Sequence, residues 1–202
     1  MSVEAVEMDA FADGQVASKL WLCEVLESHI AQGRAVSEAP RPINLWVLGG
    51  WYGVLPFLLR ARARMPIGHI RSFDIDENAT RIANLINKNW EIQQWSFRAI
   101  TADVGELEYG SEKYGPIPDV IVNTSCEHFE SMAWWERLPP GVRVVLQSTD
   151  MTHEEHFFPV NSLDEMKARF AGGLRELHYE GEKAFEYPDW SFRHFMLVGV
   201  KG

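Results

Sequence analysis

Residues Ile43-Asn-Leu-Trp-Val-Leu-Gly-Gly-Trp-Tyr-Gly53 decide the fold of this chain. The apolar run over 43–48 has the length of a buried strand, and a glycine pair interrupts it. A third glycine closes the stretch, and the apolar residues that follow it predict a helix over about 53–64. A strand, a glycine turn and a helix start let backbone N–H groups approach a ligand that side chains would otherwise exclude. The stretch therefore predicts a ligand-binding turn.

The nature of that ligand is indicated by the next predicted strand, 69–74. It ends in an acid, Asp74, which follows Gly50 by 24 residues. At this spacing a carboxylate can reach the ribose hydroxyls of a nucleoside bound at the turn. The two segments together predict a nucleoside-cofactor site.

Composition limits the class of protein. A chain of 202 residues is most simply one domain. Its two cysteines, Cys23 and Cys126, form no metal-type pair and fit a reducing cytoplasm. Residues 1–20 are acidic and lack an apolar core, so no signal peptide is predicted, and the longest apolar runs are too short to span a membrane. A formal charge of −10 opposes a nucleic-acid substrate.

Strand-like and helix-like segments alternate along the chain. Strands are predicted at 43–48, 69–74, 96–102, 119–123, 142–148, 174–184 and 191–200. Helices are predicted at 10–33 with a stop at Gly33, at 53–64, from Asp76 or Asn78 to about 89, at 129–137, and at 163–170 behind Ser162. The alternation indicates a parallel sheet. Six residues separate the last two strands, too few for a helical crossover, so these strands should pair antiparallel.

This order of elements resembles the class I S-adenosylmethionine-dependent methyltransferases over roughly residues 40–202. The resemblance implies an α/β, Rossmann-like three-layer sandwich, with a mostly parallel seven-stranded sheet and a C-terminal antiparallel hairpin. It also implies S-adenosylmethionine as the cofactor, held by a domain of residues 41–202. Residues 1–40 would form an N-terminal helical lid or extension over that domain.

The resemblance assigns the cofactor to four segments. The glycine turn would face the methionine and ribose parts, and Asp74 would accept the ribose hydroxyls. Asp103 would accept the adenine amino group, and the segment Asn123–His128 would lie next to the methyl group. The cofactor-binding residues implied are Gly49, Gly50, Trp51, Tyr52, Gly53, Asp74, Ile75, Asp103, Val104, Asn123 and Thr124. Two departures, the absence of the usual first-strand acid and the bulk of the Trp-Tyr pair in the turn, suggest a modified or narrower pocket.

The segment Asn123–His128 offers the side chains for chemistry. It follows a parallel strand, and ligands in such sheets bind beyond the carboxyl ends of the strands. Glu127 and His128 are the predicted acid or base groups, and Asn123 is predicted to orient the substrate or cofactor. The alternative is that Glu127 and His128 only hydrogen-bond neighbouring loops.

A second polar segment runs from Asp150 to His156. His153 and His156 are three residues apart, and on a helix they could share one face, as a metal site requires. Because the sequence pattern indicates no third metal ligand elsewhere in the chain, no metal site is predicted. One of these imidazoles could instead line the substrate pocket, since this segment should lie beside Asn123–His128.

The predicted function is methyl transfer from S-adenosylmethionine to a small-molecule acceptor, the acceptor class being inferred from chain size and acidity. One alternative is an enzyme that transfers or cyclises the aminocarboxypropyl arm of the same cofactor. Another is a non-catalytic nucleoside-binding module. A nicotinamide dehydrogenase is disfavoured, because the glycine spacing is Gly-Gly-x-x-Gly rather than Gly-x-Gly-x-x-Gly.

Overall fold

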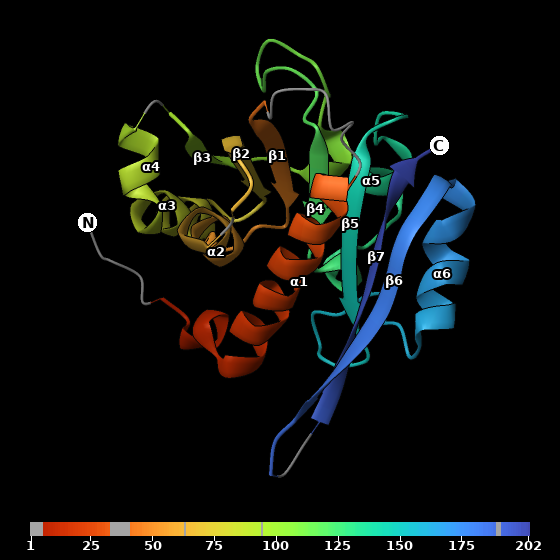
Figure 1. The fold of residues 1–202 in the computed structure, drawn as a ribbon. Helices are drawn as coiled ribbons and strands as arrows, with labels where there is room; N and C mark the ends of the chain where they lie inside the picture. The colour runs from red at the N-terminus through yellow and green to blue at the C-terminus, as the bar shows by residue number, and fades with distance from the viewer. Residues whose placement is uncertain (1–5, 33–40, 63, 94, 189–190) are drawn as a thin grey trace. The chain divides into compact units, whose positions relative to one another are not determined.

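The structure is a computed structural model that describes residues 6–32, 41–62, 64–93, 95–188 and 191–202 (Figure 1). The strands are β1 (Ile43–Leu48), β2 (Ile67–Asp74), β3 (Phe97–Thr101), β4 (Val120–Asn123), β5 (Arg143–Thr149), β6 (Leu174–Glu186) and β7 (Ser191–Lys201). The α-helices are α1 (Asp13–Gln32), α2 (Val54–Arg62), α3 (Glu77–Ile86), α4 (Lys88–Ile92), α5 (Ala133–Glu136) and α6 (Leu163–Phe170). The short 3-10 helices are η1 (Met8–Phe11), η2 (Val104–Glu106), η3 (Cys126–His128) and η4 (Ala171–Gly173).

The strands form a seven-stranded sheet in the order β3-β2-β1-β4-β5-β7-β6. The pairs β1–β2, β2–β3 and β4–β5 are parallel, whereas β5–β7 and β6–β7 are antiparallel. The predicted Rossmann-like fold class is therefore confirmed, including the closing antiparallel hairpin. The chain divides into two compact units, Met1–Val104 and Gly105–Gly202, which we describe in turn.

In the first unit, α2 packs against β2, and α3 packs against β2 and β3 (Figure 1). Strand β1 is apolar because it is buried along almost its whole length. Helix α1 packs against α2. The predicted end of this first helix, Gly33, lies outside the described residues.

Helix α3 begins as predicted, because the Asp76 side chain accepts the backbone N–H of Asn78 at 2.8 Å. The single helix predicted to run to about residue 89 is wrong: α3 ends at Ile86, and α4 begins at Lys88. Between them, the fully buried Asn87 donates from its Nδ2 to the carbonyl oxygens of Ala83 and Gly53, each at 3.0 Å. A side-chain amide that bonds the backbone in this way interrupts a helix.

In the second unit, α6 packs against the hairpin formed by β6 and β7 (Figure 1). The helix predicted at 129–137 is shorter than expected, since only Ala133–Glu136 is helical. Phe129 is extended (φ −92°, ψ 128°), and its ring lies 5.3 Å from that of Trp134. Trp134 is buried and also packs near Phe170, with ring centroids 6.0 Å apart. Packing of these aromatic rings thus accompanies the loss of helix at residue 129.

The structure confirms the predicted cap of α6 by Ser162. The Ser162 hydroxyl accepts the N–H of Glu165 at 3.1 Å, and the Glu165 carboxylate accepts the N–H of Asn161 at 2.9 Å. Ser162→Ala should lower the free energy of unfolding by about 1 kcal/mol, measured by urea denaturation. Ser125→Ala is the matched control, because the Ser125 side chain makes no cap bond to η3. Equal losses in the two variants would contradict the cap.

Across the described part of the chain, none of the helices combines the length and the apolar character needed to cross a bilayer.

Candidate functional site

The glycine turn between β1 and α2 has the backbone that its glycines allow. Gly49 and Gly53 have positive φ values of 62° and 70°, and Trp51 has a φ of 44°. Gly50 lies close to β2: its N–H donates to the Phe73 carbonyl at 3.0 Å, and a Cβ there would lie 1.9 Å from Ser72 Oγ. The turn thus presents backbone rather than side chain where it approaches the neighbouring strand.

Asp74, at the end of β2, fixes this turn. Its Oδ2 accepts the Trp51 N–H at 2.7 Å, and its Oδ1 accepts the Asp76 N–H at 3.1 Å. Burial raises the pKa of Asp74, and the N–H groups of Asp76 and Trp51 oppose that rise. A carboxylate has about four lone-pair positions, so two backbone bonds leave acceptor capacity for hydroxyl groups. A bulky residue at positive φ is costly, and the charge-assisted bond to Asp74 offsets that cost at Trp51.

The two aromatic side chains of the turn have different environments. Their rings stack, with centroids 4.8 Å apart at 22°. Tyr52 is only 3 % exposed and belongs to an apolar cluster with Ala79 and Ile82 of α3, whereas Trp51 lies partly buried at its edge. Ala10 of η1 belongs to the same cluster. The Tyr52 ring is therefore a core group, and its predicted cofactor contact would have to come from its backbone.

The remaining predicted cofactor residues of this unit lie near Asp74. Ile75 follows Asp74 directly and is 74 % exposed, which leaves an apolar side chain at the surface beside the carboxylate. The Ala102 N–H donates to the Asp74 carbonyl at 2.8 Å, so the next residue, Asp103, is held in this neighbourhood. Asp103 is exposed, whereas Val104 is buried. An exposed acid and an exposed apolar group suit the edge and the face of a heterocyclic base.

The first-strand positions that lack the usual acid are part of the core. Trp46 is 3 % exposed and Val47 is fully buried. The Trp46 ring lies 4.8 Å from that of Phe73 on β2. These side chains stabilise the sheet by apolar burial and offer no carboxylate to a ligand.

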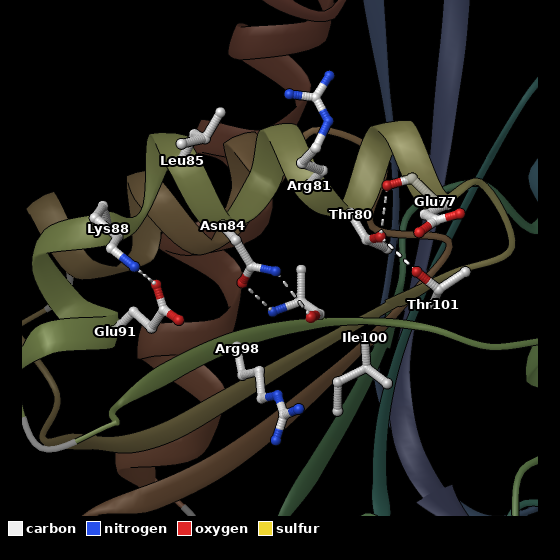
Figure 2. Close-up of a pocket in the computed structure, with 11 residues that line it drawn as sticks. Glu77, Thr80, Arg81, Asn84, Leu85, Lys88, Glu91, Arg98, Ile100 and Thr101 are labelled. Atoms are coloured by element: carbon white, nitrogen blue, oxygen red, sulfur yellow. Dashed lines mark hydrogen bonds and ion pairs between the residues drawn. The ribbon is translucent and has the colours of Figure 1, made fainter. Parts of the chain in front are cut away.

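A pocket of about 470 Å³ lies between α3 and β3 (Figure 2). Its lining residues are Glu77, Thr80, Arg81, Asn84, Leu85, Lys88, Glu91, Arg98, Ala99, Ile100 and Thr101. Figure 2 shows Asn84 pointing at β3, where it donates to the Ala99 carbonyl at 3.0 Å and accepts the Ala99 N–H at 2.8 Å. Asn84 thereby covers the backbone of an edge strand. No predicted site residue lines this pocket, although Thr101 is the register partner of Asp74.

In the second unit, the predicted catalytic segment begins at the buried end of β4. Asn123 is fully buried, and its Oδ1 accepts the Ser125 N–H at 2.9 Å. Its Nδ2 has no hydrogen-bond partner among the described residues. Thr124 is half-buried beside it. A buried donor without a partner is costly, so Asn123 is suited to hold an acceptor atom of a ligand.

Glu127 and His128 form the next turn, η3, and the structure joins it to the loop after β5. The Glu127 carbonyl accepts the N–H groups of Phe157 and Phe158, at 2.8 and 3.0 Å. This confirms the expected proximity of the two loops, which follow adjacent parallel strands. The rings of His128 and His156 have centroids 4.6 Å apart, and His128 Nε2 lies 3.9 Å from Glu127 Oε1.

The pKa values of His128 and Cys126, two titratable groups of this segment, shift in opposite directions. Partial burial, and secondarily the neighbouring His156, lower the pKa of His128 to about 4, so its imidazole is neutral at pH 7. Burial, and secondarily the Glu127 carboxylate, raise the pKa of Cys126 well above its usual range. Cys126 therefore stays a thiol, whereas His128 has a lone pair for a proton or a ligand.

The loop after β5 is not helical over 151–156, so the helix face proposed for His153 and His156 does not exist. Asp150 is instead paired with Arg193 of β7: Arg193 Nε donates to Asp150 Oδ2 at 2.9 Å, and the Arg193 N–H donates to Oδ1 at 2.6 Å. Arg193 also donates to the Asn161 carbonyl at 2.9 Å. The sequence analysis missed this pair, because 43 residues separate its members. It anchors both ends of the loop that carries the two histidines.

No protein-family model matches the chain, and no curated protein sequence matches it significantly. Several solved structures do. The magnesium protoporphyrin IX methyltransferase from Synechocystis PCC 6803 with bound S-adenosylmethionine has a TM-score of 0.60 and 16% identity, covering 97% of this chain and 86% of that chain.

Two further methyltransferases are similar to this chain. The N-methyltransferase NodS from Bradyrhizobium japonicum WM9, in complex with S-adenosylhomocysteine, has a TM-score of 0.55 and 13% identity, covering 87% of this chain and 86% of that chain. The plantazolicin methyltransferase BpumL was solved in complex with a monoazolic desmethyl analog and S-adenosylhomocysteine. It has a TM-score of 0.60 and 13% identity, covering 91% of this chain and 84% of that chain. Similarity at these identities establishes the fold and not the reaction. The chain therefore has the class I S-adenosylmethionine-dependent methyltransferase fold.

Proposed function

We propose that this protein binds S-adenosylmethionine and transfers its methyl group to a small-molecule acceptor. The observation that carries the proposal is the glycine turn, whose backbone is fixed by Asp74 through the 2.7 Å bond to the Trp51 N–H. Structures of the same fold were solved with S-adenosylmethionine or S-adenosylhomocysteine bound. The fold and the turn support one cofactor class.

The residues of the first unit fit this cofactor. Asp74 keeps acceptor capacity for ribose hydroxyls beside its bonds to the Trp51 and Asp76 N–H groups. Ile75 offers an exposed apolar surface for the adenine ring, and Asp103 offers an exposed carboxylate for its amino group. When bound, the cofactor supplies a sulfonium-activated methyl group for in-line displacement. The chain then has to position the acceptor and, where needed, remove its proton.

Those tasks are proposed for the end of β4. Asn123 would orient an acceptor atom through its buried Nδ2. Glu127 is only 4 % exposed, and His128 is neutral at pH 7, so each could accept a proton. Thr124, half-buried beside Asn123, would contact the cofactor.

The N-terminal segment is proposed as a lid on the first unit. Ala10 belongs to the apolar cluster of Tyr52, and Val6 and Trp51 pack against that cluster. Residues that precede the first long helix thus share an apolar cluster with the aromatic pair of the glycine turn. Displacement of this segment would expose that pair, which is the behaviour expected of a small lid.

The acceptor class is proposed from the neighbours. They include methyltransferases named for magnesium protoporphyrin IX and for plantazolicin, neither of which is a nucleic acid. A net charge of −10 disfavours a nucleic acid. A small molecule therefore stays the proposed acceptor.

The proposal is tested by calorimetric titration of the purified protein with S-adenosylmethionine, S-adenosylhomocysteine and NAD. Saturable binding of the first two, and no binding of NAD, is the expected result. If none of the three binds, the nucleoside-site proposal is wrong. For a protein that binds the cofactor, product analysis after incubation with candidate acceptors identifies the reaction. S-adenosylhomocysteine indicates methyl transfer, and methylthioadenosine indicates use of the aminocarboxypropyl arm.

A further inference from the structure

The second unit brings one carboxylate and two imidazoles together where η3 meets the loop after β5. One ligand atom from each of Glu127, His128 and His156 can be chosen so that all three lie within 4.8 Å of one another. Two imidazoles and a carboxylate with open positions are a ligand set for divalent first-row transition metals. We propose that Glu127, His128 and His156 bind one such metal ion.

The hydrogen bonding of His156 prepares it for this role. Its Nδ1 lies 2.7 Å from the Met151 carbonyl oxygen. A carbonyl oxygen can only accept, so Nδ1 carries the proton, and in the neutral imidazole Nε2 carries the lone pair. Histidines that bind metals usually donate their second ring N–H to a carbonyl or carboxylate in this way, which fixes the tautomer and the ring orientation. His156 therefore presents Nε2 as its ligand atom.

The backbone around the cluster is fixed by several bonds. The Glu127 carbonyl accepts two N–H groups from the loop that carries His156, those of Phe157 and Phe158. The guanidinium of Arg169 in α6 donates to the Phe158 carbonyl and, at 3.2 Å, to the Pro159 carbonyl. Ligands held on a fixed backbone lose less conformational freedom when a metal binds.

The spacing of the ligand atoms fits a site that closes on a metal. With metal–ligand bonds of about 2.0–2.2 Å, neighbouring ligand atoms lie roughly 3.0–3.6 Å apart. His128 Nε2 and Glu127 Oε1 are 3.9 Å apart. The Glu127 side chain is 6 % exposed and that of His128 is 40 % exposed, so rotation of the histidine can shorten the longer separations. The exposed side leaves coordination positions for water or for an oxygen of a ligand.

Neighbouring side chains are less suitable as ligands. His153 Nδ1 accepts the Glu155 N–H at 3.3 Å, which places the ring proton on Nε2 and leaves that atom a donor. Cys126 is buried, and its Sγ points to the Asn123 carbonyl at 3.8 Å. Asp150 is paired with Arg193. His153 is therefore a matched control: it is the same residue type, on the same loop, with its ring centroid 5.6 Å from that of His156.

Metal binding does not depend on the proposed methyltransferase function, because no cofactor contact is used to define the site. It does affect the roles within that function. A metal ion would use the lone pair that His128 needs as a base, so metal binding and proton abstraction by His128 exclude each other. In the metal-loaded protein, an acceptor oxygen could instead bind the metal, which lowers the pKa of a coordinated hydroxyl or water.

The test uses the full chain after a chelator has removed any bound metal. Binding of Zn²⁺ is measured by calorimetric titration, and binding of Co²⁺ is measured by titration followed by visible absorption. The wild type and His153→Asn should each bind one ion per chain with the same affinity. Glu127→Gln and His156→Asn should bind more than about 100-fold more weakly, because loss of a ligand should exceed the 10–100-fold effect of an outer-shell partner.

Thermal denaturation with and without Zn²⁺ shows whether each variant is folded and supplies a second readout. Zn²⁺ should raise the Tm of the wild type and of His153→Asn, and should raise that of the two ligand variants far less. Unchanged affinity in both ligand variants would overturn the site. So would an equal loss of binding in His153→Asn, or the absence of binding in the folded wild type.

Discussion

Gly53→Ala is expected to lower the free energy of unfolding by about 2–5 kcal/mol. Gly53 has a φ of 70°, and an L-residue in this conformation costs roughly 1–2 kcal/mol. The added Cβ would also lie 2.8 Å from Asn87 Nδ2, 2.9 Å from Ala83 Cβ and 3.3 Å from Ala83 Cα. The last of these atoms is backbone of α3 and cannot rotate away, so an overpacking cost of about 1–3 kcal/mol adds to the strain.

This loss of stability is measured by urea denaturation, with circular dichroism as the signal for unfolding. Gly141→Ala is the matched control, because Gly141 has a φ of 82° but a Cβ there would have no atom within 4 Å. The control should show the backbone cost alone, about 1–2 kcal/mol. If the two variants were destabilised equally, close packing of the glycine turn on α3 would be refuted.

Asp74→Ala is expected to weaken S-adenosylmethionine binding by about 1.5–3 kcal/mol, or roughly 10–150-fold in Kd. The substitution removes the acceptor proposed for the ribose hydroxyls. It also removes the acceptor of the Trp51 N–H, which holds a tryptophan at positive φ in the glycine turn. Both losses weaken binding, because the first removes a contact in the complex and the second leaves a turn that the ligand has to order as it binds.

Calorimetric titration of the variant gives the change in Kd, and thermal denaturation shows whether it is folded. Asp76→Ala is the control for charge: it removes a neighbouring carboxylate that caps α3 through the Asn78 N–H. This control should lose about 1 kcal/mol of stability and should keep its affinity within a few-fold. A folded Asp74→Ala protein with wild-type affinity would show that Asp74 does not contact the cofactor.

Much of the fold was predictable because its signals are local. The apolar run of β1, the glycines after it and the caps at Asp76 and Ser162 each act within a few residues. Six residues join the last two predicted strands, and this length dictated antiparallel pairing because so short a segment cannot form a crossover.

The errors came from specific side-chain contacts. Asn87 ends α3 because its side chain reaches the Gly53 carbonyl, 34 residues away. Phe129 is extended beside Trp134, so the helix predicted there is only four residues long. Neither effect is visible in helical periodicity, which reports only the propensity of a segment.

The residues of the candidate sites also divide into those that local sequence signals indicated and those that only long-range contacts brought together. The sequence indicated Asp74 and the pair Glu127–His128 by their positions after strands, and the structure places each at a strand end or in the turn that follows. The sequence placed His156 either on one helix face with His153, in a helix that does not form, or in the substrate pocket. Its approach to His128 depends on backbone bonds between two loops, and such bonds follow from the order of strands in the sheet.

The sequence by itself determined the fold class, the glycine turn and the polar segments at the strand ends, because side-chain periodicity, glycine conformation and capping are properties of a few adjacent residues. Only the tertiary structure decided that Tyr52 is a core residue, that Asp150 is paired with Arg193, and that His156 lies against His128. Those outcomes depend on burial and on hydrogen bonds between residues far apart in the chain. Such contacts form only when the sheet brings its loops together.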